Sequence, residues 1–224
     1  MTEQQRRAYL EAMGIDVWLP RDAPDPVVDT RPADAPPAAS LGWDELRSCV
    51  ASCVRCELHR GRTQTVFGVG DRTANWMLIG EAPGAEEDRR GEPFVGRAGK
   101  LLDEMLRAVG LAREQVYIAN TVKCRPPGNR NPTPGEAASC REYLDRQIEL
   151  VDPAIIVAVG KIAAQNLLQS DAPVGRLRGR EHRYGRIPLV VTYHPAYLLR
   201  SPTQKRLVWD DLCLARKLLE ARRA

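Results

Sequence analysis

Three side chains with useful chemistry lie in or directly after apolar, strand-like runs of the sequence. Glu81 and His194 each follow such a run, and Asn120 lies within a third. A carboxylate can position water, an amide can read a hydrogen-bonding edge, and an imidazole can stabilise developing charge. Because ligands of open α/β sheets bind at the carboxyl ends of the strands, we predict that Glu81 and His194 reach one cleft.

Each of these residues also has a plain structural explanation. The segment 80–102, which contains Glu81, five glycines and a cluster of acids, is either a ligand-binding loop or an acidic surface loop. Asn120 shares a strand face with apolar residues, so its amide bonds either to neighbouring backbone or to a ligand. A lone histidine is usually structural, but the proline after His194 favours an extended backbone at the strand end.

Six cysteines are present, and four of them have spacings that suggest a metal site. Cys53 and Cys56 form a C-x2-C pair, and Cys124 and Cys140 bracket a loop rich in Pro, Gly and Asn. Four thiolates can hold either a structural zinc ion or an iron-sulfur cluster, and the spacing alone does not separate the two. We interpret the remaining pair, Cys49 and Cys213, as plain core thiols.

The elements that position these residues alternate between strands and helices. Buried strands are predicted at 76–79, 116–122, 154–160 and 187–193, and helices at 98–109, 161–168 and 204–222. This alternation predicts an α/β fold with a parallel sheet. The basic connector 171–186 is interpreted as a solvated loop.

The chain has 224 residues and a net charge of +4, which is unevenly distributed. Residues 1–40 hold four Arg against seven Asp and Glu, so the remaining 184 residues carry 29 basic and 22 acidic groups. A basic body suits a polyanion partner, although many globular domains carry similar charge. The sequence contains no apolar run long enough for a membrane span and no signal-peptide core, so we expect a cytoplasmic protein with no membrane partner.

Three regions are predicted along the chain. Residues 1–19 form an amphipathic segment that either docks in cis or binds a partner protein. Residues 20–40 are a Pro-rich linker with too little apolar area to form a core. Residues 41–224 form the folded domain, which we expect to be a monomer.

Taken together and in order, these motifs resemble the family 4 uracil-DNA glycosylases, the iron-sulfur branch of their superfamily. The resemblance runs from about Cys53 to the C-terminus and is carried by GEAPGAEED, EPFVGRAGKLL, NTVKCRPPGNRNP, HPAYLLRS and the paired cysteine spacings. It implies a three-layer α/β sandwich with a central, mainly parallel four-stranded sheet flanked by helices. It also implies a structural 4Fe-4S cluster with the ligands Cys53, Cys56, Cys124 and Cys140.

The residues that match the family's catalytic and base-binding motifs are Glu81, Ala82, Pro83, Phe94, Asn120 and His194. The resemblance implies that Phe94 stacks on the flipped base and that Asn120 reads the uracil edge. Glu81 would position the attacking water, and His194 would donate a hydrogen bond to the anion that develops on uracil O2. No lysine is needed, and Lys123 alternates to the opposite strand face. The expected enzyme is therefore a monofunctional glycosylase that leaves an abasic site.

Contact with double- or single-stranded DNA containing uracil is expected from two loops. The loop after Cys124 contributes Arg125, Asn129 and Arg130. The HPAYLLRS segment contributes the candidates for a wedge that fills the vacated stack, Tyr197, Leu198, Leu199 and Arg200. Glu86, Glu87 and Asp88 receive no role.

The N-terminal segment raises a second hypothesis. Residues 6–21 loosely resemble the N-terminal peptide of the psi subunit of the DNA polymerase III clamp-loader assembly, whose fold is glycosylase-like. The alternative function is therefore a replication adaptor with secondary or no catalytic activity, which would bind a replication protein through residues 1–19.

Overall fold

The computed structural model describes residue 13 and residues 37–223. The predicted partner-binding segment, apart from Met13, and the linker up to residue 36 lie outside the described residues. In chain order the elements are η1 (Ala38–Ser40), α2 (Trp43–Ala51), η2 (Glu57–Arg60), β1 (Val69–Gly70), β2 (Trp76–Gly80), α3 (Ala85–Arg90), α4 (Arg97–Ala108), η3 (Arg113–Gln115), β3 (Tyr117–Asn120), η4 (Pro127–Asn129), α5 (Pro134–Val151), β4 (Ile155–Val159), α6 (Lys161–Leu168), α7 (Val174–Leu177), β5 (Glu181–Tyr184), β6 (Ile187–Thr192), α8 (Pro195–Arg200), η5 (Pro202–Gln204) and α9 (Lys205–Arg223).

The described strands form one sheet in the order β1-β3-β2-β4-β6-β5. The four central strands are parallel, which confirms the predicted mainly parallel, four-stranded centre. Two short strands that the sequence did not predict, β1 and β5, add to the edges in antiparallel orientation. β1 has only two residues, so its sequence carries no alternation from which a strand could be predicted.

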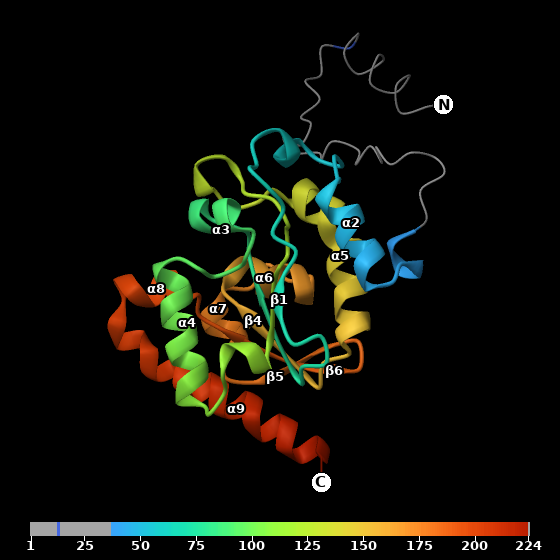
Figure 1. The fold of residues 1–224 in the computed structure, drawn as a ribbon. Helices are drawn as coiled ribbons and strands as arrows, with labels where there is room; N and C mark the ends of the chain where they lie inside the picture. The colour runs from blue at the N-terminus through green and yellow to red at the C-terminus, as the bar shows by residue number, and fades with distance from the viewer. Residues whose placement is uncertain (1–12, 14–36, 224) are drawn as a thin grey trace.

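Helices cover both faces of the sheet, as expected for a three-layer sandwich (Figure 1). Alternate residues of the central strands point to opposite faces. Met77 and Ile79 pack in the layer that contains α5 and α6, whereas Trp76 and Leu78 pack in the layer that contains α4, α8 and α9. A third apolar cluster joins α2 to the start of α5 and includes Cys124 and Cys140.

The predicted solvated loop 171–186 is wrong over much of its length. It contains α7 and the edge strand β5, which pairs with β6. Glu181 and Arg183 of β5 are exposed, whereas His182 and Tyr184 are half-buried. The Tyr184 hydroxyl donates a 2.5 Å hydrogen bond to Asp145 of α5. The run reads as basic because Arg176, Arg178, Arg180 and Arg186 lie in the segments on either side of β5, whereas the inward residues of the strand follow the two-residue period of a strand.

The carboxyl ends of the parallel strands come together at one edge of the sheet. Gly80 at the end of β2 is in register with Asn120 at the end of β3, and Val159 of β4 is in register with Thr192 of β6. Four chain segments therefore leave the sheet side by side.

Within the described residues, no helix combines the length and the apolar character needed to cross a membrane.

Candidate active site

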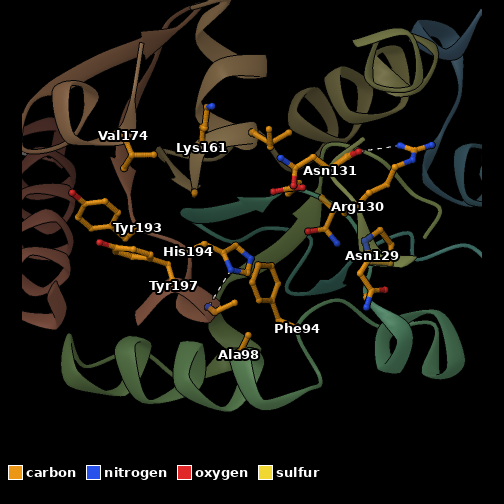
Figure 2. A pocket seen from close by; sticks show the side chains of 18 of the residues that line it. Phe94, Ala98, Asn129, Arg130, Asn131, Lys161, Val174, Tyr193, His194 and Tyr197 are labelled. Atoms are coloured by element: carbon orange, nitrogen blue, oxygen red, sulfur yellow. Dashed lines mark hydrogen bonds between the residues drawn. The ribbon is translucent and has the colours of Figure 1, made fainter. Parts of the chain in front are cut away.

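A cavity of about 730 Å³ lies at this strand edge, within the range of about 300–1,000 Å³ typical of ligand pockets. Its lining includes every residue expected in catalysis and base binding: Glu81, Ala82, Pro83, Phe94, Asn120 and His194. Figure 2 shows Phe94 and His194 side by side, with Tyr193 and Tyr197 on one side of them and residues 129–131 on the other. The structure thus brings together residues that are more than 100 positions apart in the chain.

The Asn120 side chain ends in a buried acceptor without a partner. Asn120 is only 2 % exposed, and its Oδ1 has no hydrogen-bond partner among the described residues. An unsatisfied buried acceptor costs about 1–3 kcal/mol, so its retention favours a ligand over neighbouring backbone as the partner. A donor that enters the cavity can satisfy this oxygen.

Gly80 creates the space in which Asn120 and Phe94 approach each other. A Cβ atom on Gly80 would lie 2.5 Å from Asn120 Oδ1 and 2.6 Å from Phe94 Cζ. Both side chains therefore lie directly over the backbone of this glycine, with the amide oxygen next to the ring. Any larger residue at position 80 must push them away.

Phe94 has a backbone conformation that non-glycine residues rarely adopt, with φ of 53°. The carboxylate of Glu87 holds the loop on both sides of it, because it accepts hydrogen bonds from the backbone N–H groups of Gly84 (3.1 Å), Val95 (3.0 Å) and Gly96 (3.0 Å). Gly99 lets helix α4 pack against the carbonyl of Phe94, since a Cβ there would lie 1.7 Å from that oxygen.

These contacts account for the acidic run that the sequence left without a role. Besides Glu87, Asp88 is buried and accepts hydrogen bonds from the backbone N–H groups of Thr63 and Gln64. Glu86 is exposed and pairs with Arg89 at 2.6 Å. One signal was available in the sequence, because a Glu three residues after Gly84 matches the N3 position of a helix start.

His194 is the N-cap of α8 and lies against the Phe94 ring, with 5.5 Å between the ring centroids. The backbone N–H of Ala196 donates to its Nδ1 at 3.1 Å, so Nδ1 carries no proton and the neutral ring carries its proton on Nε2. Burial lowers the pKa of His194 to about 4, so the imidazole is neutral at physiological pH. The ring can then donate one hydrogen bond through Nε2–H.

Glu81 lines the same cavity from the first residue after β2. Its backbone carbonyl accepts hydrogen bonds from the Val122 N–H (3.2 Å) and the Thr121 hydroxyl (2.5 Å), which fixes the start of the loop. Partial burial raises the pKa of the Glu81 carboxyl. A partly desolvated carboxylate interacts more strongly with a nearby positive charge than one in water does.

The first of the two predicted DNA-contacting loops is held in place by its own side chains. Arg130 donates to both oxygens of Glu136 at 2.6 and 2.8 Å, and Arg125 donates to Asn129 Oδ1 at 2.8 Å. Asn129 and Arg130 line the cavity, whereas Arg125 does not. The loop thus forms one wall near the mouth of the cavity.

In the second predicted loop, the expectation for Leu198 is wrong. Leu198 is 0 % exposed because α8 directs Pro195 and Leu198, three positions apart, into the core. Leu199 is 40 % exposed, and Tyr197 stacks on Tyr193 with 5.0 Å between ring centroids. Tyr197 and Arg200 line the cavity, so the surface candidates for a wedge are Tyr197, Leu199 and Arg200.

The sequence did not single out Lys161 or Tyr193 as cavity residues. Lys161 is exposed and begins α6 directly after β4. Tyr193 follows β6, one residue before His194. Both could have been found by applying the strand-end rule to every predicted strand.

Lys123 lies outside this cavity, as predicted, but strand alternation is not the reason, because β3 ends at Asn120 and Lys123 lies in the bend that follows. Its buried ammonium group donates to the Asn120 carbonyl at 2.8 Å and to Gln147 Oε1 at 2.5 Å. Burial lowers the pKa of Lys123 to about 8. The lysine closest to Asn120 in sequence is therefore occupied inside the protein.

The four cysteines of the predicted metal site line a second, small cavity, together with Arg62 and Tyr143. Burial raises the pKa of the Cys140 thiol to about 12. Among residues 13 and 37–223, no three His, Cys, Asp or Glu side chains are grouped closely enough to hold one metal ion. The four thiols surround a space instead. Cys49 and Cys213 are half-buried, and the Cys49 sulfur lies 3.7 Å from the Tyr143 hydroxyl.

Comparisons with known proteins agree with this geometry. Residues 67–213 match the family model described as the uracil DNA glycosylase superfamily. The chain is 46% identical over 167 residues to the type-4 uracil-DNA glycosylase of Archaeoglobus fulgidus, with 71% of this chain and 84% of that protein covered. It is 43% identical over 175 residues to the type-4 enzyme of Thermotoga maritima, with 76% of this chain and 91% of that protein covered.

Proposed function

The chain belongs to the uracil DNA glycosylase superfamily, and on this premise we propose that it is a type-4 uracil-DNA glycosylase that hydrolyses the bond between uracil and deoxyribose. The observation that carries the proposal is the unpartnered, buried Oδ1 of Asn120 beside the Phe94 ring. A flat base that offers a hydrogen-bond donor to that oxygen satisfies both features at once.

Uracil has the donor and acceptor pattern that suits this amide. Its N3–H donates to Asn120 Oδ1, and its O4 accepts from the side-chain NH₂ group. Cytosine presents the opposite pattern at both positions, so it leaves two polar pairs mismatched inside a closed pocket, and such mismatches give large discrimination. Stacking on Phe94 supplies about 1–3 kcal/mol toward the cost of flipping the base out of the helix.

The bond between C1′ of the sugar and N1 of uracil breaks with both electrons leaving on the base. Negative charge then develops on uracil O2, where Nε2–H of the neutral His194 donates a hydrogen bond. A neutral donor that is already in place keeps its proton and stabilises the leaving anion by hydrogen bonding alone. Water forms the new bond to C1′, and the Glu81 carboxylate orients that water and attracts the positive charge on the sugar. The water releases one proton as it adds to C1′, and the uracil anion takes up one proton, so the products are free uracil and an abasic site.

DNA reaches this cavity along a surface that carries Asn129, Arg130 and Arg200 on its rim and Tyr197 and Leu199 beside it. Phosphate contacts from the basic residues supply affinity without sequence preference. An exposed side chain of α8 fills the gap that the extruded nucleotide leaves. Leu199 suits this role best, because it is apolar and exposed, whereas Tyr197 stacks on Tyr193.

We also propose that Cys53, Cys56, Cys124 and Cys140 hold a 4Fe-4S cluster. The donor set fits such a group, since four thiols line one cavity without converging on a single-ion position, and a cluster is larger than one ion. When bound, the cluster supplies a covalent cross-link between the segment 53–56, the end of the Asn120 loop and helix α5. It takes no part in the hydrolysis.

The test is incubation of the purified protein with an oligonucleotide that contains one uracil, followed by alkali to cleave abasic sites. We expect cleavage at uracil and none at cytosine or thymine in the same position. Asn120→Ala and His194→Ala should each lower the rate of abasic-site formation by at least about 100-fold, as expected for lost electrostatic or positioning contacts. Full activity of both variants refutes the assignment of the site.

A further inference from the structure

Arg62 reaches from the surface into the cavity that the four cysteines surround. Its Nη1 donates to the carbonyl of Cys53 at 2.8 Å and to the sulfur of Cys124 at 3.1 Å. Its Nη2 donates to the carbonyl of Ala51 at 3.1 Å. One guanidinium group therefore connects the C-x2-C segment to a cysteine that follows it by about 70 residues in the chain.

The contact with sulfur is the informative one. Metals bind cysteine as the thiolate, and Cys124 is only 5 % exposed, so its negative charge receives little help from water. A hydrogen bond from a charged donor stabilises a buried anion more strongly than a neutral donor does. The two carbonyl contacts fix the orientation of the guanidinium, so that the second N–H of Nη1 points at the sulfur.

We propose that Arg62 is a positioning residue for the iron-sulfur cluster, which holds the Cys124 thiolate in place as a ligand and supplies positive charge beside it. This inference rests on the cofactor part of the proposed function. The reduction potential of a cluster depends on its net charge and on hydrogen bonds to its sulfurs. Arg62 thus sets both how long the cluster is retained and how easily it is reduced.

Arg62 also contacts carbonyls at the end of α2, so a role limited to capping that helix is the competing explanation. A cap contributes to the stability of the fold but has no reason to change the reduction potential. The potential therefore separates the two roles.

The experiment compares the full-length wild type with Arg62→Gln, Arg62→Lys and the control Arg60→Gln, all purified without oxygen. Arg60 lies two residues away and is a suitable control because its side chain is 71 % exposed and pairs only with the exposed Glu57 in the described part of the chain. Iron content, the rate of iron loss to a chelator and the midpoint potential of the cluster are measured for each protein. Circular dichroism checks that each variant is folded.

We expect Arg62→Gln to lose iron about 10- to 100-fold faster than the wild type, the usual effect of removing a residue that supports a metal ligand. Its potential should be more negative, because a positive charge and a hydrogen bond are lost. Arg62→Lys, which keeps the charge without the fork, should retain a potential closer to the wild type than Arg62→Gln does. Arg60→Gln should behave as the wild type.

If the wild type contains iron and Arg62→Gln has the same rate of iron loss and the same midpoint potential, this inference is overturned and the cofactor proposal stands. If both Arg62 variants lose iron faster but keep the wild-type potential, the role of Arg62 is that of a helix cap, and the inference is overturned as well. A wild-type protein without iron overturns the cofactor proposal and this inference together. If Arg62→Gln does not fold, Arg62→Met, which also removes the charge and the hydrogen bonds, takes its place in the same two measurements.

Discussion

Replacing Gly80 with alanine tests the geometry of the base pocket without removing any functional group. The new Cβ would lie 2.5 Å from Asn120 Oδ1 and 2.6 Å from Phe94 Cζ. To restore an ordinary contact of 3.4 Å, the two side chains must retreat by about 0.8–0.9 Å, and a displacement of about 1 Å at a catalytic site lowers the rate by about 100-fold. Overpacking a buried position costs about 1–3 kcal/mol of stability, and the melting midpoint falls by about 2–4 °C for each kcal/mol.

The assay is the single-turnover rate of uracil excision, with thermal melting of the same preparation. Gly135→Ala is the matched control, since a Cβ at that position would meet no atom within 4 Å apart from its chain neighbours and the backbone of its own helix. We expect Gly80→Ala to lose about two orders of magnitude in rate while remaining folded at the assay temperature, and Gly135→Ala to keep full activity. A Gly80→Ala protein that excises uracil at the wild-type rate refutes the contact between Gly80, Asn120 and Phe94 as the organising feature of the pocket.

Four further predictions concern three positions in the described structure and the N-terminal segment. The imidazole of His194 should titrate near pH 4 instead of 6.5 by nuclear magnetic resonance. Because the unfolded state takes up this proton at a higher pH than the folded state does, His194 should lower the free energy of unfolding as pH falls from 6.5 toward 4. His194→Gln should remove that part of the acid sensitivity. Glu87→Gln should lower both the excision rate and the melting midpoint, whereas Glu86→Gln, at an exposed surface pair, should change neither by much; equal effects contradict the loop-anchoring contacts. Leu198→Ala should lower stability by about 2–5 kcal/mol in denaturant titrations and leave the DNA affinity of the folded protein unchanged, so a specific loss of DNA binding contradicts its burial. A peptide of residues 1–19 should recover a replication protein from a cell extract if the adaptor hypothesis holds, and recovery of none removes it.

The parallel centre of the sheet could be predicted from the sequence because buried strands appear as continuous apolar runs. The same runs place Glu81 and His194 at one edge, and this follows from chain order alone. The role of Glu87 could not be predicted in the same way, because its partners at positions 95 and 96 meet it only after the loop has folded back. The burial of Leu198 could not be predicted from the local pattern either, since a helix of six residues is too short to show a clear hydrophobic period.

The strand order has a consequence for how the protein is made. The cavity takes walls from four segments, the first beginning at residue 81 and the last at residue 193, and the central strand β4 lies between two others that are distant in sequence. Such non-local pairing forms late, since the ends of long loops must first be brought together. A chain still on the ribosome therefore presents its basic loop and Asn120, the amide proposed to read the base, before it has His194, which is proposed to stabilise the leaving base. On the proposed mechanism, such a chain does not excise uracil efficiently until residue 194 has been synthesised.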